Sequence, residues 1–274
     1  MKIVVTGADG LLGPFLTDGL ATLGTVVPMN RARGDLRDAV VTQELLRGEQ
    51  PDVVIHTAAY TDVAGCERDP ERARLDNREA TRHVADACRT NTQLIYVSTD
   101  QVYPDVEGPH REDLVAPVNV YGRTKLEGER AALLHPRALV LRTNFFAESR
   151  SPGRASLSDV IVRTLSERRR FPGFTDSLFS PLHADTLAAQ IGRCISDGLT
   201  GVYNLGCRAG CSKADFARLV ARHLGLDEHL VESTLSTQVS GRAPRASDLR
   251  MDVTAYMDAS GILLPTLDEE VDRL

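Results

Sequence analysis

The sequence predicts an α/β fold in which a doubly wound parallel sheet carries a smaller C-terminal lobe. Short apolar runs alternate with stretches of helical periodicity through the first half of the chain, as strands buried between two layers of helices do. The first run ends in a glycine-rich turn that opens the next helical stretch. After residue 144 the chain changes to a segment rich in serine, proline and glycine, which indicates a second, smaller part.

Five apolar runs are expected to form the sheet. Each of the last three follows a stretch of helical spacing, so we expect the chain to cross between strands through helices. Pro28 in the second run has no amide hydrogen to donate, which indicates an exposed end of a strand rather than its middle. The expected strands are residues 2–6, 25–29, 53–56, 94–97 and 139–142.

Capping residues mark several helix boundaries. The helical spacing of residues 11–23 ends at Gly24, a residue type common at helix C-termini. Asp69 precedes a proline at a first helical position, and Ser212 with Asp215 three residues later has the pattern of a capping box.

The chain is expected to divide near residue 145. Residues 1–145 would form the first domain, and residues 146–274 would form the smaller lobe. Residues 178–206 contain a further helix and the strand expected at 202–204, and we expect this segment to return to the first domain.

Composition excludes several classes of protein. The net charge of -6 disfavours nucleic acid or an acidic membrane as a partner. Five cysteines without CxxC spacing argue against a disulfide framework and a zinc site, and we expect no metal. Neither a leader pattern nor an apolar run of membrane-spanning length is found, so the expectation is a soluble, cytoplasmic protein.

The turn after the first strand has the spacing of a phosphate cradle. Gly7, Gly10 and Gly13 follow the pattern GxxGxxG, in which glycines permit a sharp turn and let phosphate oxygens approach backbone N–H groups at a helix N-terminus. This strand, turn and helix predict a Rossmann-type fold that binds a dinucleotide. A plain strand-to-helix turn is the alternative.

The residues after the second strand bear on the choice of dinucleotide. An acid commonly binds the ribose 2′-OH of NAD at this place, but here Arg31 and Arg33 follow the strand. Arg31 could pair with a 2′-phosphate, so NADP(H) is expected to be preferred. Asp35 leaves NAD(H) open as a second cofactor, and loop arginines in solvent are the alternative.

Tyr121 and Lys125 have the spacing of a catalytic pair. A tyrosine is a poor acid or base at neutral pH unless a nearby positive charge stabilises its phenolate, and a lysine four residues on lies on the same helix face. Thr99 ends the fourth expected strand, where its hydroxyl can share a substrate carbonyl with the tyrosine. Together these residues suggest hydride chemistry on a carbonyl, although YxxxK alone is usually a surface pair.

Several segments strengthen this interpretation through their combination and order. They are MKIVVTGADGLLG (1–13), GDLRD (34–38), PDVVIHTAAYTDV (51–63), STDQVY (98–103), PVNVYGRTKLEGE (117–129) and LRTN (141–144). With them the chain resembles the dTDP-4-dehydrorhamnose reductase family of the extended short-chain dehydrogenase/reductase superfamily. Beyond residue 145 the similarity becomes sparse.

The resemblance implies NADPH-dependent reduction of the keto group of a nucleotide-linked 4-keto-6-deoxy sugar, with Thr99, Tyr121 and Lys125 as the catalytic residues. Tyr121 would protonate the keto oxygen, and Lys125 would lower the pKa of Tyr121 and hold the nicotinamide ribose. Arg245 would meet the nucleotide diphosphate in the substrate-binding lobe, and a homodimer is left open. The implied cofactor contacts are Gly7, Asp9, Gly10, Leu11, Leu12, Gly13, Arg31, Asp35, Leu36, Ala58, Ala59, Tyr60, Asn77, Tyr121 and Lys125.

The chain departs from this family in the sugar pocket. The family commonly has STDYVF after the fourth strand, and a serine and a tryptophan after the fifth. Here Gln101, Asn144 and Phe145 take those places, and the chain has no tryptophan. These three residues are candidate substrate contacts, with ordinary packing as the alternative.

Two other functions stay open at this point. A sugar-nucleotide epimerase uses the same three catalytic residues with tightly held NAD⁺, although its second strand usually ends in an acid and its lobe is larger. The regulatory subunit of methionine adenosyltransferase also resembles this family and keeps the glycine turn, so a non-catalytic NADP-binding role is the third reading.

Overall fold

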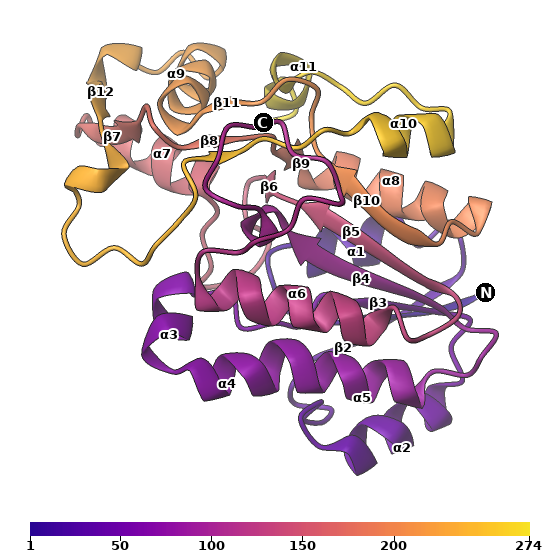
Figure 1. Ribbon diagram of the computed structural model, residues 1–274. Coiled ribbons are helices and arrows are strands. Elements are labelled where there is room, and N and C mark those ends of the chain that lie inside the picture. Colours follow the sequence, from indigo (N-terminus) through magenta and orange to yellow (C-terminus); the bar gives the residue numbers. More distant parts are fainter.

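A six-stranded parallel sheet forms the centre of the computed structural model, which describes residues 1–274 (Figure 1). Its strand order is β10-β5-β4-β3-β1-β2, and every neighbouring pair is parallel. The predicted α/β fold with a doubly wound parallel sheet is therefore confirmed. The strands are β1 (Lys2–Thr6), β2 (Thr25–Met29), β3 (Val53–His56), β4 (Gln93–Thr99), β5 (Ala138–Thr143) and β10 (Gly201–Leu205).

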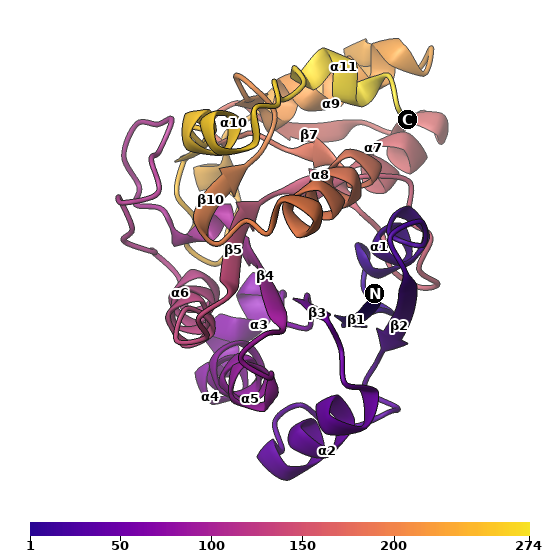
Figure 2. The same cartoon turned by 90° about the vertical axis from the view of Figure 1, so that its right-hand side faces the viewer.

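Two layers of helices cover the sheet (Figure 2). α1 contacts α8 on one face, with α10 beside α8, and α2, α5 and α6 follow one another on the other face. The larger apolar core lies on the α1 and α8 side and continues into the lobe, whereas a smaller one lies beneath α2, α5 and α6. Nowhere does a helix reach the length and apolarity that crossing a lipid bilayer requires. The bounds are α1 (Gly13–Gly19), α2 (Ala39–Glu49), α5 (Ala80–Ala87), α6 (Val120–Ala132), α8 (Ala184–Asp197) and α10 (Thr254–Ser260).

Three short helical pieces connect β3 to α5. They are α3 (Val63–Arg68), α4 (Pro70–Arg74) and the π-helical turn η1 (Leu75–Glu79). The Asp69 side chain caps α4 by accepting a hydrogen bond from the Arg72 amide at 3.0 Å. A π-turn interrupts the regular helix and is frequent at functional sites; here it carries Asp76 and Asn77.

The smaller lobe lies over the carboxyl ends of the central strands (Figure 1). The Ser212 hydroxyl accepts a hydrogen bond from the Asp215 amide at the start of α9, but the Asp215 carboxylate returns to that hydroxyl and not to the backbone, so the capping box is only half formed. The helices of the lobe are α7 (Leu157–Ser166), α9 (Lys213–His223) and α11 (Leu267–Val271), with the single-turn helices η3 (Glu228–Leu230) and η4 (Ser236–Gln238). A further single-turn helix, η2 (Asp100–Val102), follows β4 in the first part of the chain. Its short strands are β6 (Phe145–Phe146), β7 (Phe171–Phe174), β8 (Leu178–Phe179), β9 (Leu182–His183), β11 (Cys211–Ser212), β12 (Val231–Thr234) and β13 (Asp248–Leu249).

The expectation for the first helix is wrong at both ends. α1 spans Gly13–Gly19 because the glycine turn occupies the residues before it and because turns follow Leu20. Gly24 is not its cap. A Cβ on Gly24 would lie 2.0 Å from the Met1 carbonyl oxygen, so glycine here lets β2 approach the start of β1. Pro28 is exposed on β2, which is the edge strand of the sheet.

Candidate active site

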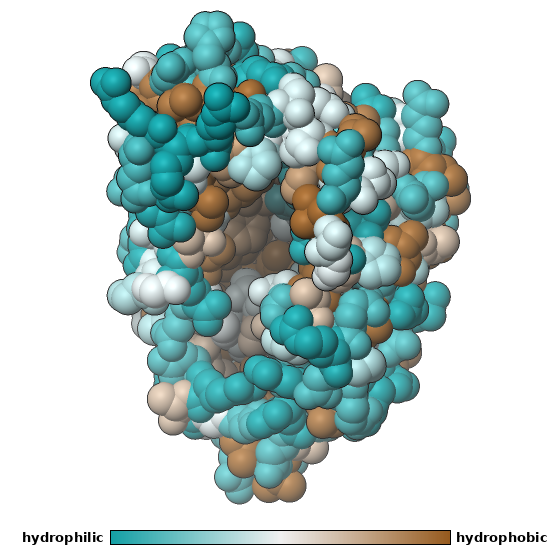
Figure 3. All heavy atoms as spheres, turned by 90° about the vertical axis from the view of Figure 1, so that its left-hand side faces the viewer, coloured by the Kyte–Doolittle hydropathy of each residue, from teal (hydrophilic) through white to brown (hydrophobic).

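A large cleft runs along the carboxyl ends of the central strands, between the sheet and the lobe. Its volume is about 850 Å³, and Figure 3 shows it as a hollow in the face turned toward the viewer. In open parallel sheets, ligands bind at this edge where the strand order reverses, which here falls between β1 and β3. The cleft is therefore the candidate active site.

The turn after β1 has the shape that a pyrophosphate requires. Gly7 has a φ of +67°, which favours glycine, and a Cβ there would lie 2.7 Å from the Ala58 amide nitrogen. A Cβ on Gly13 would lie 2.0 Å from the Ala8 carbonyl oxygen, so this glycine lets α1 pack onto the turn and stays behind the cleft surface. The helix N-terminus is thereby left open to an anion. The residues of this turn that line the cleft are Gly7, Asp9, Gly10, Leu11 and Leu12.

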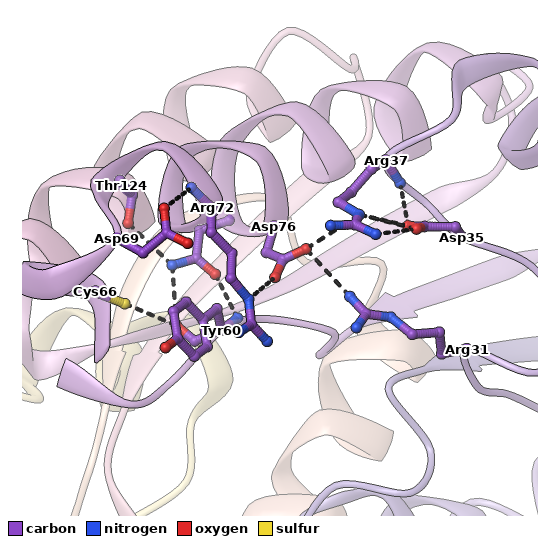
Figure 4. A network of polar contacts seen from close by, with 10 residues as sticks. Arg31, Asp35, Arg37, Tyr60, Cys66, Asp69, Arg72, Asp76 and Thr124 are labelled. Carbon is purple, nitrogen blue, oxygen red and sulfur yellow. Dashed lines mark hydrogen bonds and ion pairs between the residues drawn. The ribbon is translucent and has the colours of Figure 1, made fainter. Parts of the chain in front are cut away.

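Beyond β2, three arginines share one carboxylate at the cleft wall (Figure 4). Asp76 is 8% exposed and lies 3.3 Å from Arg31, 3.4 Å from Arg72 and 3.6 Å from Arg37. Arg37 also forms hydrogen bonds with Asp35, which lower the pKa of that carboxyl to about 2. Arg31 is 64% exposed and is the most accessible of the three arginines. Leu36 lines the same end of the cleft.

Asn77 lies behind the cleft wall rather than in it. Its side chain is fully buried, accepts a hydrogen bond from the Tyr60 amide at 2.7 Å and donates to the Tyr60 carbonyl oxygen at 3.1 Å. A further bond of 3.0 Å reaches Thr124 on α6. Asn77 on the π-turn thus links Tyr60, which lines the cleft with Ala58 and Ala59, to the helix that carries Tyr121.

Thr99, Tyr121 and Lys125 line one stretch of the cleft wall. Thr99 is the last residue of β4, and the other two side chains come from the first turns of α6. A Cβ on Gly122 would lie 2.1 Å from the Gln101 carbonyl oxygen, so glycine at this position lets α6 approach the end of β4. The fold therefore brings together three residues that the sequence separates into two motifs.

Lys125 is held in a buried position. Its Nζ donates a hydrogen bond to the Val97 carbonyl oxygen at 2.7 Å and lies 4.0 Å from the centroid of the Tyr96 ring. Burial lowers the pKa of Lys125 to about 7, and the negative charge of Glu129, one helical turn further on, opposes this change. The charge of Glu129 thus favours the protonated form of the lysine.

The ionisation of Tyr121 depends on its burial and on its neighbours. Burial raises the pKa of Tyr121, a hydrogen bond with Thr99 offsets part of this change, and the negative charge of Asp100 adds to it. The resemblance implies that Lys125 lowers this pKa; here the Lys125 Nζ donates to the Val97 carbonyl oxygen, and its effect on Tyr121 stays a prediction. The phenol is protonated at neutral pH, which is the form that a proton donor needs.

Asp100 is a buried carboxylate that the sequence analysis did not assign. It accepts hydrogen bonds from Asn144 at 2.7 Å, Thr99 at 3.2 Å and Gln101 at 3.3 Å. Burial raises its pKa. The only signal for it in the sequence is its place directly after the strand-end hydroxyl. Gln101, Asn144 and Phe145 line the cleft around it, and both amides turn a donor toward Asp100.

Asn119 connects three parts of the site with one buried side chain. Its Oδ1 accepts a hydrogen bond from the Gly122 amide at 2.7 Å and so caps α6. Its Nδ2 donates to the Gln101 side-chain oxygen at 3.1 Å and to the Pro244 carbonyl oxygen of the lobe at 3.0 Å. The lobe segment before Arg245 is therefore tied directly to the start of the helix that carries Tyr121.

The lobe contributes three cations to the cleft, the first of which is Arg154. Arg245 lines it, as does Lys213, the first residue of α9. The sequence analysis did not assign Lys213, and a lysine after a capping serine gives no signal of a cleft. Across the chain, no three His, Cys, Asp or Glu side chains converge in a way that would hold a metal ion.

Comparisons with known proteins agree with this geometry. The RmlD substrate binding domain family matches residues 1–274. A probable low-salt glycan biosynthesis reductase of Haloferax volcanii is 30% identical over all of this chain and 97% of its own length. The dTDP-4-dehydrorhamnose reductase of Mycobacterium tuberculosis H37Rv is 33% identical, over 90% of this chain and 83% of its own. Among solved structures, a dTDP-4-dehydrorhamnose reductase of Bacillus anthracis in complex with NADP superimposes with a TM-score of 0.92 at 24% identity, covering 99% of this chain and 97% of its own.

Proposed function

Because the chain belongs to the RmlD substrate binding domain family, we propose that it reduces the keto group of a nucleotide-linked 4-keto-6-deoxy sugar with NADPH. The observation that carries this proposal is that Thr99, Tyr121 and Lys125 line the same cleft as the glycine turn. The names of its relatives, which are reductases, support the same reaction.

Reduction of a ketone requires a hydride at the carbon and a proton at the oxygen, and the bound dinucleotide supplies the hydride. Tyr121 transfers its hydroxyl proton to the keto oxygen as negative charge develops there, which makes a phenol of raised pKa an adequate donor. Thr99 donates a hydrogen bond to the same oxygen and orients it. The positive charge of Lys125 stabilises the phenolate that remains.

The charges at the far end of the cleft favour NADP(H). Arg31 follows β2, is 64% exposed and shares Asp76 with two other arginines, so it can turn to form a charge-assisted hydrogen bond with a 2′-phosphate. Asp35, the nearest acid in sequence, is paired with Arg37, so it repels such a phosphate less. NAD(H) fits the same glycine turn but lacks the group that Arg31 would bind.

The two parts of the chain divide this work in our proposal. Residues 1–145 hold the dinucleotide together with α8 and β10, since β10 pairs with β5 in the central sheet. The rest of residues 146–274 holds the nucleotide sugar. Figure 1 shows this lobe above the ends of the strands.

The test is incubation of the purified protein with NADPH and a dTDP-4-keto-6-deoxyhexose, followed by the loss of NADPH absorbance. We expect oxidation of NADPH and, in Tyr121→Phe, a fall of about 10²–10⁴-fold in kcat, the range for loss of a general acid, with unchanged NADPH affinity. Full turnover by Tyr121→Phe would overturn the role of this residue.

Two results would overturn the proposed function and identify a different one. Stoichiometric NAD⁺ in the purified protein, with sugar interconversion and no net oxidation of cofactor, would identify an epimerase. Co-purification with a larger synthetase and no sugar reduction would identify a binding subunit.

A further inference from the structure

Two arginines in the cleft wall have Asp76 as their only carboxylate partner. Arg31 follows β2 and Arg72 lies on α4, and both reach the carboxylate of Asp76 on the π-turn η1 (Figure 4). Neither arginine forms an ion pair with another acid. All three residues line the cleft, so these ion pairs stand where a bound dinucleotide would meet them.

The contacts with Asp76 are long for charged partners. Arg31 and Arg72 donate to its carboxylate at 3.3 and 3.4 Å, whereas charge-assisted N–H···O bonds are typically about 2.7–2.9 Å long. One shared carboxylate cannot form a two-bond pair with each guanidinium. Arg37 shows the contrast, because its Nε donates to both oxygens of Asp35, at 3.0 and 2.9 Å. Arg37 thus has a partner of its own, and Arg31 and Arg72 are the two that can exchange theirs.

The two arginines are more accessible than the acid that holds them. The side chains of Arg31 and Arg72 are 64% and 46% exposed, and that of Asp76 is 8% exposed. A ligand in the cleft therefore meets the cations before the carboxylate. The Arg72 guanidinium also lies 4.1 Å from the centroid of the Tyr60 ring, a contact that can keep it in place when its acidic partner changes.

We propose that Asp76 takes the place of the 2′-phosphate of NADP(H): it binds Arg31 and Arg72 while no such phosphate is present and releases them when NADPH binds. This inference rests on the proposed function and adds Asp76 and Arg72 as residues that determine cofactor selectivity. A phosphate monoester has three acceptor oxygens and close to two negative charges, so it can accept short bonds from both guanidinium groups. With NADH the arginines stay paired with Asp76, which makes the preference for NADPH smaller than two unpaired arginines would give.

Fluorescence titrations of NADPH and NADH into the cofactor-free protein test this assignment. Asp76→Asn keeps the size of the side chain and removes the charge that competes for the arginines. We expect it to lower the dissociation constant of NADPH about tenfold and to change that of NADH by less than about twofold. Arg72→Met should raise the dissociation constant of NADPH about tenfold and leave that of NADH unchanged. Glu79→Gln, which should change neither constant, is the matched control on the same π-turn, because Glu79 is paired with Arg74 and Arg82 and does not line the cleft.

A combined variant separates an exchange of arginines from plain repulsion between Asp76 and the phosphate. With Arg31→Ala and Arg72→Met both present, the two exchanging cations are gone, so adding Asp76→Asn should change the dissociation constant of NADPH by less than about twofold. An undiminished gain in NADPH affinity in that background would indicate direct repulsion and overturn the exchange. Weaker binding of NADH to Asp76→Asn would overturn it too, because Asp76 would then contact the ribose itself.

The outcomes also separate this inference from the proposed function. Unchanged affinities for both dinucleotides in Asp76→Asn and in Arg72→Met would reject the role of Asp76, while sugar reduction by the wild type would leave the reductase standing. Arg72 is half exposed, so this part of the test does not depend on how Asp76→Asn folds. The expected changes in NADPH affinity without sugar reduction would support the exchange and reject the reductase.

Discussion

The buried ion pair between Glu129 and Arg142 offers the most direct test of the structure. Glu129 lies on α6 and Arg142 on β5, and their side chains are 2% and 4% exposed. Arg142 Nε and Nη2 donate to the carboxylate at 3.0 and 2.8 Å. The Ser98 hydroxyl donates to the same carboxylate at 2.5 Å. The perturbation is Glu129→Gln, which keeps the size of the side chain and removes its charge.

The expected loss of stability comes from the Arg142 guanidinium, which would stay buried without its carboxylate partner. Removing one partner of a buried ion pair costs about 3–5 kcal/mol. Arg142 also donates to the Glu112 carbonyl oxygen at 2.6 Å and the Tyr103 hydroxyl at 3.2 Å, and these acceptors place the expected cost at the lower end, about 3 kcal/mol. For a chain of this size the corresponding decrease in Tm is roughly 6–12 °C.

Thermal unfolding followed by circular dichroism measures this change. Adding Arg142→Met to Glu129→Gln removes the uncompensated charge, so the double variant should melt above the single one. Glu127→Gln on the same helix is the control, because Glu127 is 42% exposed and its contact with Arg78 is 4.0 Å long. A Glu129→Gln protein that melts within about 1 °C of the wild type, or a double variant that melts lower still, would refute the reasoning.

Three other predictions follow from the same structure. Arg31→Ala should raise the dissociation constant of NADPH about tenfold or more, the size expected for a lost charge-assisted hydrogen bond, and leave the dissociation constant of NADH unchanged. Fluorescence titrations measure both constants, and an equal increase in both would contradict the prediction. Burial lowers the pKa of Lys125 from 10.5 to about 7. Between these pH values the unfolded chain binds more protons than the folded chain, so this residue makes the free energy of unfolding rise with pH. Urea unfolding of Lys125→Met should lack this rise, and a pH dependence identical to that of the wild type would reject the prediction. Asn119→Ser keeps the helix cap but loses the donors to Gln101 and Pro244. We expect the free energy of unfolding to fall by about 1–2 kcal/mol and the KM for the nucleotide sugar to rise, with the KM for NADPH unchanged. A higher KM for both would argue against a role of Asn119 in connecting the lobe to α6.

Features that depend on neighbouring residues could be predicted from the sequence. The glycine turn after β1 follows from its spacing, because a positive φ and a close approach are properties of a few consecutive residues. The position of Thr99 at the end of β4 follows from the apolar run before it. Pro28 marks an edge because its missing hydrogen bond is a property of one residue.

Features that depend on distant residues could not be predicted. Asp76 shares its carboxylate with Arg31 across 45 positions of the chain, and Lys213 faces Asp100 only because the lobe covers the ends of the strands. The ionisation of Tyr121 shows the same limit, since spacing reveals that Lys125 is near but does not reveal how deeply both groups are buried. The charges around a group and its burial depend on residues that only the folded chain brings together, and no short segment of the sequence indicates either.

The return of the chain to the sheet through α8 and β10 has a consequence for folding. A fragment that stops at residue 145 would lack β10, so the outer backbone groups of β5 would have no partner and would be open to strands of other molecules. It would also lack α8, which covers the apolar surface of α1. The last third of the polypeptide thus completes the sheet and the helix layer that the first half begins. We expect the nascent sheet to be protected from aggregation only after synthesis has reached residue 205.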